Sequence, residues 1–171
     1  MRATHLRVFL SALAISVITA SASFAQTTPA QQPAAGRGAA APISPAARTA
    51  RFGVWDNSTN PNNVMTYELY EKDGSKLTVS NPSNPASDWS YVTLFDGVFR
   101  PVTGQAGAET AVELINEKSI RITNKRNGVI NQVVINTISD DGNTISNEYI
   151  RLNPEGKIMG VTHVTYNRRK K

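Results

Sequence analysis

Cysteine is absent from all 171 residues of the chain. Its absence excludes disulfides, thiolate nucleophiles, cysteine-ligated zinc and lipid attachment through an N-terminal cysteine. Histidine is scarce as well, since His5 and His163 are the only two, and neither a nucleophile-elbow motif nor EF-hand spacing is present. The sequence therefore predicts no catalytic residue, no metal site and no cofactor, and we expect a protein that is not an enzyme.

The chain also lacks an apolar run that is long enough to span a bilayer. The longest run, Val8–Ala20, has 13 residues, whereas a spanning helix needs roughly 20. Arg2 and Arg7 precede it and a small-x-small site ends at Ala25, which is the pattern of a secretory signal peptide over residues 1–25, cleaved after Ala25. We expect a periplasmic or secreted protein whose mature chain has no transmembrane segment.

Positive charge is scarce in the part of the chain that folds, although the formal net charge is +5. Nine of the 18 basic residues lie outside residues 52–167, whereas all 13 acidic residues lie inside, so this part carries about −4. Nucleic-acid binding needs a basic face on the folded domain, and we expect no nucleic-acid partner. The basic C-terminal residues instead offer a contact for anionic surfaces: Arg168, Arg169, Lys170 and Lys171.

Composition divides the mature chain into three parts. Residues 26–50 are dominated by Ala, Pro, Gln and Thr, which predicts a disordered linker without helix or strand. Its prolines are Pro29, Pro33, Pro42 and Pro45. Residues 51–168 form the predicted domain, of a size that can bury one core without disulfides, and residues 169–171 form a basic tail.

From Phe52 onward, short segments rich in Val, Ile, Thr, Tyr and Trp alternate with turn dipeptides such as Asp73-Gly74 and Asn127-Gly128. Asn-Gly and Asp-Gly favour the type I′ turns of β-hairpins. Nine strands are predicted, near Phe52–Asp56, Val64–Glu71, Lys76–Ser80, Trp89–Phe95, Ala111–Ile115, Ser119–Asn124, Val129–Ser139, Thr144–Leu152 and Ile158–Tyr166.

The predicted fold is all-β, an antiparallel up-and-down meander of about eight to nine strands. Closure into a barrel would remove the exposed pairing edges of such a meander. In Val129–Ser139 the alternation is lost because Val133, Val134 and Ile135 are consecutive. That run is typical of a strand that is covered on both faces or that carries a bulge.

Gly53-Val54-Trp55, at the head of the first strand, resembles the Gly-x-Trp signature that opens lipocalins. The resemblance implies a lipocalin-like barrel in which Gly53 and Trp55 plug one end. It also implies a basic residue near the last strand that packs over the tryptophan, and both Arg168 and Arg169 qualify.

Over Phe52–Asn167 the chain resembles more closely a group of exported bacterial lipocalin-like (calycin-type) β-barrel proteins. The shared features are turns, namely Phe95-Asp96-Gly97, Pro101-Val102-Thr103-Gly104, Thr123–Val129 and Ser139–Thr144. Asp56 and Arg100 depart from the group, which usually has Lys and an aromatic residue at these positions. The resemblance implies the fold, and the group brings no established activity.

Aromatic residues are the main candidates for a binding site. Tyr67, Trp89, Tyr91 and Tyr149 lie on three of the predicted strands, where inward-facing rings would either line a small apolar cavity or fill the barrel. We predict a binding module for a small hydrophobic or amphipathic ligand. The alternative is a cell-envelope interaction protein that has no ligand cavity and acts through its exterior and its basic tail.

Overall fold

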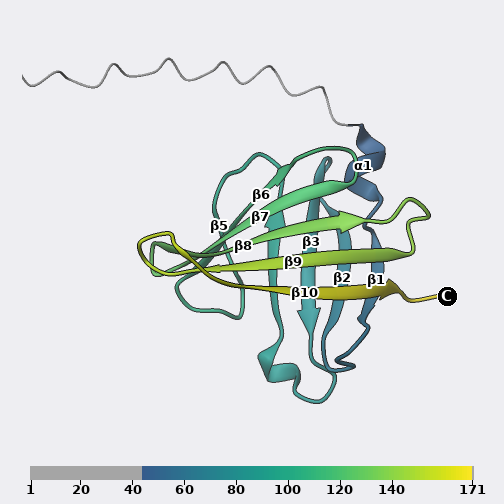
Figure 1. Cartoon of the computed structure of the whole chain (residues 1–171). Coiled ribbons are helices and arrows are strands. Elements are labelled where there is room, and N and C mark those ends of the chain that lie inside the picture. The colour runs from purple at the N-terminus through teal and green to yellow at the C-terminus, as the bar shows by residue number, and fades with distance from the viewer. Residues whose placement is uncertain (1–43, 171) are drawn as a thin grey trace, which may run out of the picture. The chain divides into compact units, whose positions relative to one another are not determined.

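Ten antiparallel strands form one continuous sheet in the computed structural model, which describes residues 44–170 (Figure 1). The predicted signal peptide, residues 26–43 of the predicted linker and Lys171 lie outside the described residues. The strands are β1 (Gly53–Asn57), β2 (Val64–Tyr70), β3 (Gly74–Ser80), β4 (Trp89–Thr93), β5 (Arg100–Pro101), β6 (Ala108–Leu114), β7 (Ser119–Arg126), β8 (Val129–Ile138), β9 (Thr144–Leu152) and β10 (Ile158–Arg168).

The sheet curls into a barrel because its first and last strands pair with each other. The order is β4-β3-β2-β1-β10-β9-β8-β7-β6-β5. Apart from the pair β1–β10, all adjacent strands in the sheet are also consecutive in the sequence. The remaining gap, between β4 and β5, narrows where Ser90 and Thr103 exchange two backbone hydrogen bonds of 3.0 and 2.8 Å. The predicted all-β meander that closes into a barrel is therefore confirmed.

The tenth strand is the element that the sequence pattern missed. β5 has only two residues, and one of them, Pro101, has no amide proton to donate to the sheet. β6 also begins at Ala108 rather than at the predicted Ala111. Ala108, Glu109 and Thr110 pair with β7, although Ala108 and Glu109 lack the β-branched or aromatic side chains typical of strands.

The β7–β8 hairpin explains the consecutive apolar residues in β8. Asn127 and Gly128 both have positive φ angles, 51° and 81°, as the predicted type I′ turn requires. The register shifts so that Asn131 has no partner, which is a bulge of one residue. After it Val134 points into the barrel and is 3% exposed, while Val133 and Ile135 are half-buried.

The prediction of a linker without helix or strand was wrong for its last residues. Residues Pro45–Thr49 form a helix, α1, which the prolines were expected to prevent. Pro45 begins this helix, where a missing amide proton costs nothing, and the Ser44 hydroxyl accepts a hydrogen bond from Ala47 N at 3.3 Å. In the described part of the chain, no helix is long and apolar enough to cross a membrane.

Trp55 is fully buried and contacts Arg51, which follows α1 by two residues. Its indole Nε1 donates to the Arg51 carbonyl at 2.8 Å, and the Arg168 guanidinium stacks on its ring, 4.1 Å from the centroid. Gly53 has a φ of 129°, and a Cβ there would lie 3.0 Å from an Arg168 nitrogen. Of the two cations that the resemblance left open, Arg168 is the one that covers the tryptophan.

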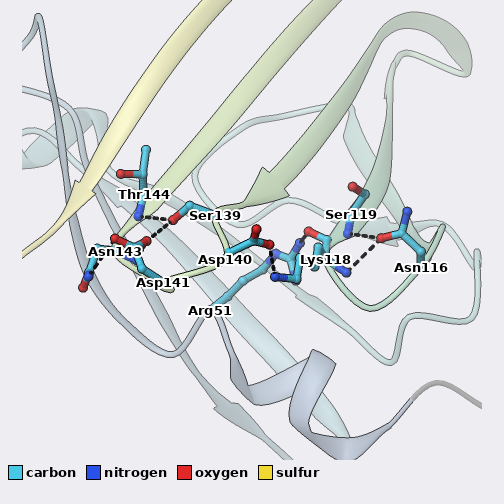
Figure 2. A network of polar contacts seen from close by, with 9 residues as sticks. All are labelled: Arg51, Asn116, Lys118, Ser119, Ser139, Asp140, Asp141, Asn143 and Thr144. Carbon is cyan, nitrogen blue, oxygen red and sulfur yellow. Dashed lines mark hydrogen bonds and ion pairs between the residues drawn. The ribbon is translucent and has the colours of Figure 1, made fainter.

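The turns after β6 and β8 complete this end of the barrel (Figure 2). The Lys118 carbonyl accepts a 2.6 Å hydrogen bond from Arg51, and the Lys118 ammonium pairs with Asp140. Asp141 accepts from Ser139, and hydrogen bonding within the turn lowers the pKa of Asp141 to about 2. These aspartates therefore stabilise turns, as their positions in a hairpin predict.

The predicted basic tail is partly bound to the barrel. Arg168 donates to three backbone carbonyls, those of Gly142, Phe52 and Ala50, at 2.6 to 2.7 Å. Arg169 pairs with Asp56 on the surface. Two of the four cations that were expected to contact an anionic surface thus hold the chain end in place.

Replacement of Arg168 by methionine should destabilise the barrel. Arg168→Met removes three charge-assisted hydrogen bonds and the stacking on Trp55, and we expect the free energy of unfolding in urea to fall by about 2 kcal/mol. Arg169→Met is the matched control, because it removes one exposed ion pair and should have a much smaller effect. Equal losses in the two variants would contradict this role for Arg168.

Candidate functional site

A cavity of about 460 Å³ lies inside the barrel. This volume falls in the range of roughly 300 to 1,000 Å³ that is usual for small-molecule sites. Side chains therefore do not fill the interior, which was the alternative that the sequence left open.

All four predicted ligand-binding residues line this cavity. Tyr67 lies on β2, Trp89 and Tyr91 lie on β4, and Tyr149 lies on β9; β3 separates β2 from β4 in the sheet. The Trp89 and Tyr91 rings stack, with centroids 6.3 Å apart and planes 22° apart. The predicted plug residues Gly53 and Trp55 do not line the cavity.

The cavity has two chemically different walls. One comes from β2, β3 and β4 and is apolar and aromatic, formed by Met65, Tyr67, Leu77, Val79, Trp89 and Tyr91. The other comes from β6 to β9. Among its aliphatic residues it carries amides and hydroxyls, which include those of Thr110, Asn124, Gln132, Asn147 and Tyr149, together with charged residues near the opening. A ligand would meet an apolar surface on one side and hydrogen-bonding groups on the other.

The polar groups of the second wall are linked to one another. Asn136 donates to Asn147 at 2.7 Å, Asn147 donates to the Tyr149 hydroxyl at 2.9 Å, and that hydroxyl lies 3.3 Å from the hydroxyl of Tyr166. Asn124 accepts from Thr110 at 2.8 Å and donates to Gln132 at 2.9 Å. Because buried polar groups are costly unless they are paired, these links allow an amide-rich wall inside the barrel.

Arg51 joins this network to the closed end of the barrel. Its fully buried guanidinium donates to the side-chain oxygen of Asn136 at 2.7 Å and to the carbonyls of Ala47, Lys118 and Asn136. Burial lowers the pKa of Arg51, yet an arginine remains charged in a protein. Since these four acceptors already bind its guanidinium, and Arg51 does not line the cavity, it is a positioning residue for Asn136.

The buried phenols of the cavity are uncharged at neutral pH. Burial raises the pKa of Tyr67 to about 12, and it also raises the pKa values of Tyr91 and Tyr166 above that of a free phenol. Each of these side chains therefore keeps its proton and can donate a hydrogen bond.

The hydroxyl of Tyr91 is the unpaired polar group of the cavity wall. Tyr91 is 4% exposed, and its hydroxyl has no hydrogen-bond partner among residues 44–170. A buried hydroxyl without a partner costs about 1 to 3 kcal/mol. The fold therefore leaves one buried hydroxyl of a cavity-lining residue without a hydrogen bond.

The cavity opens at the end of the barrel opposite α1. Three of its lining residues, Arg126, Asn131 and Arg151, are exposed, and they come from the hairpins that join β7 to β8 and β9 to β10. Figure 1 shows these hairpins on the left and α1 on the right. Arg126 also donates to the Ala106 carbonyl and to Gln105, so it ties the β5–β6 loop to this opening.

Sequence analysis missed the amide wall, although its pattern contains a signal for it. Ile145, Asn147, Tyr149 and Arg151 alternate along β9 and share one face. The buried Ile145 marks that face as interior, so Asn147 should have been expected inside the barrel. His163, the histidine considered for catalysis, is exposed on β10 and does not line the cavity.

Comparison with known structures identifies the type of barrel. A fatty acid binding protein of Schistosoma mansoni, solved in complex with arachidonic acid, matches 72% of this chain and 99% of its own, with 11% identity and a TM-score of 0.54. The N57A mutant of the fluorescent protein UnaG matches 71% of this chain and 98% of its own, with 13% identity and a TM-score of 0.51.

These matches show a calycin-type barrel of the kind found in fatty acid binding proteins, and at such low identity they show the fold alone. No protein-family model matches the chain. No curated protein sequence matches it either.

The unpaired hydroxyl of Tyr91 predicts an unusual effect on stability. In the ligand-free protein, Tyr91→Phe should raise the free energy of unfolding by about 1 kcal/mol, because it removes a buried hydroxyl that has no partner. Tyr149→Phe is the matched control and should lower it by about 1 kcal/mol, since Asn147 then loses its acceptor. Thermal unfolding of both variants tests this, and a loss in Tyr91→Phe as large as that in Tyr149→Phe would contradict it.

Proposed function

We propose that this protein is an exported binding module for a small hydrophobic or amphipathic molecule, which it holds inside the barrel. The observation that carries the proposal is the cavity of about 460 Å³, which has exposed residues at its opening. Trp55 and its two arginines close the other end of the barrel. A barrel without a binding role would gain stability if larger side chains filled this space.

The chemistry of the walls supports an amphipathic ligand. Apolar and aromatic side chains on β2 to β4 would bury an apolar surface, and the amides of β7 to β9 would fix its orientation through hydrogen bonds. The fatty acid binding protein with a similar fold is itself described in complex with a lipid.

The proposal places the protein in the periplasm or outside the cell. Its basis is the signal-peptide pattern of residues 1–25, with cleavage after Ala25. An exported barrel with one open end would suit a carrier or scavenger of poorly soluble molecules.

Binding can be tested with N-phenyl-1-naphthylamine, an uncharged dye that fluoresces in apolar surroundings. We expect the full chain to bind this dye with saturation, and Val134→Phe to weaken binding by about tenfold or more, because the new ring would occupy the cavity. Val134 is 3% exposed and lines the cavity. Fluorescence titration measures both affinities.

Val133→Phe is the matched control, since the same change is made one residue earlier, where the side chain does not line the cavity. It should bind the dye like the unmodified chain, and circular dichroism should show that both variants fold. Absence of saturable binding to the unmodified chain would overturn the proposed function, and equal losses in the two variants would place the dye outside the cavity.

A further inference from the structure

Three cations surround the opening of the cavity. Lys125 and Arg126 come from the end of β7, and Arg151 comes from the facing end of β9; all three line the cavity. Lys125 lies over the Phe99 ring, with its ammonium 3.5 Å from the centroid, and the guanidinium of Arg126 bonds only neutral oxygens of Ala106 and Gln105.

One carboxylate lies beside these three charges, because Glu109 is the cross-strand neighbour of Lys125. The described residues form five ion pairs, and none of them includes Lys125, Arg126 or Arg151. Glu109 is the one carboxylate that lines the cavity, so the lining carries two more positive than negative charges. The opening is thus cationic on a domain whose residues 52–167 carry about −4.

The interior behind this opening has no charged group that could compete for an anion. Its deep polar groups are amides and phenols, and the buried Arg51 lies outside the cavity with its donors bound to neutral oxygens. An acid group on a ligand would therefore be held at the opening, where water also reaches it, and not deep in the barrel.

The lining behind the opening combines aromatic rings with amides. The stacked rings of Trp89 and Tyr91 offer an apolar surface on one side, and Asn124, Gln132 and Asn147 face the same space from the other.

We propose that the ligand is an organic anion, held with its carboxylate, sulfonate or phosphate group at Lys125, Arg126 and Arg151. Its apolar body lies against Trp89 and Tyr91. This proposal rests on the proposed function and adds to it the charge of the ligand and its orientation. The three cations attract the acid group during entry and bind it once the body is inside.

A matched pair of dyes separates the two proposals. 8-Anilinonaphthalene-1-sulfonate has the ring system of N-phenyl-1-naphthylamine together with one sulfonate. We expect the full chain to bind the sulfonated dye about tenfold more tightly than the neutral dye. Added salt should weaken binding of the sulfonated dye and leave the neutral dye unaffected.

Substitution of the rim should abolish this preference. In the triple variant Lys125→Gln, Arg126→Gln and Arg151→Gln, we expect equal affinities for the two dyes, because the sulfonate no longer meets a cation at the opening. Arg121→Gln is the control, because Arg121 is a cation of the same β7 strand that pairs with Glu113 and does not line the cavity. Val134→Phe should weaken binding of both dyes, which places them in the cavity.

Each outcome decides between the proposals. Saturable binding of the neutral dye without a preference for the sulfonated dye would overturn the anion proposal and leave the proposed function standing. A preference that persists in the triple variant, or sulfonated-dye binding that Val134→Phe does not weaken, would also overturn it. Absence of binding by either dye would overturn both.

Discussion

The barrel depends on the enclosure of Trp55 by two arginines from opposite ends of the domain. Arg51 precedes β1 and Arg168 ends β10, and Arg168 binds the carbonyls of Phe52 and Ala50, 116 and 118 residues earlier in the chain. A meander leaves its first and last strands as open edges unless they meet. These contacts hold β1 and β10 together in a protein that has no disulfide to do so.

Hydrogen bonds from the closed end of the barrel also allow polar side chains to lie in its interior. Through Asn136, Arg51 is the first member of a hydrogen-bonded series that reaches Asn147 and Tyr149 on the cavity wall. Paired amides cost little inside a barrel, whereas unpaired ones would destabilise it. The same network therefore stabilises the fold and supplies a wall with hydrogen-bonding groups beside the cavity.

Charge is distributed differently in space than in the sequence. The C-terminal cluster looked like a free basic tail, yet Arg168 binds backbone carbonyls of the domain and Arg169 pairs with Asp56 on its surface. The cations that face the cavity instead come from two strands in the middle of the chain, β7 and β9. Strand register brings these residues to one opening. Because they do not form a continuous basic run in the sequence, the sequence pattern did not predict a cationic opening.

The sequence by itself determined the all-β meander, because alternation along a strand and Asn-Gly or Asp-Gly turns act through neighbouring residues. It also determined that Tyr67, Tyr91 and Tyr149 belong to strands. Only the tertiary structure decided that a cavity remains, that its second wall is made of amides and that its rim is cationic. The physical reason is that the space left inside a barrel depends on the volumes of side chains from strands far apart in sequence and on the register between them.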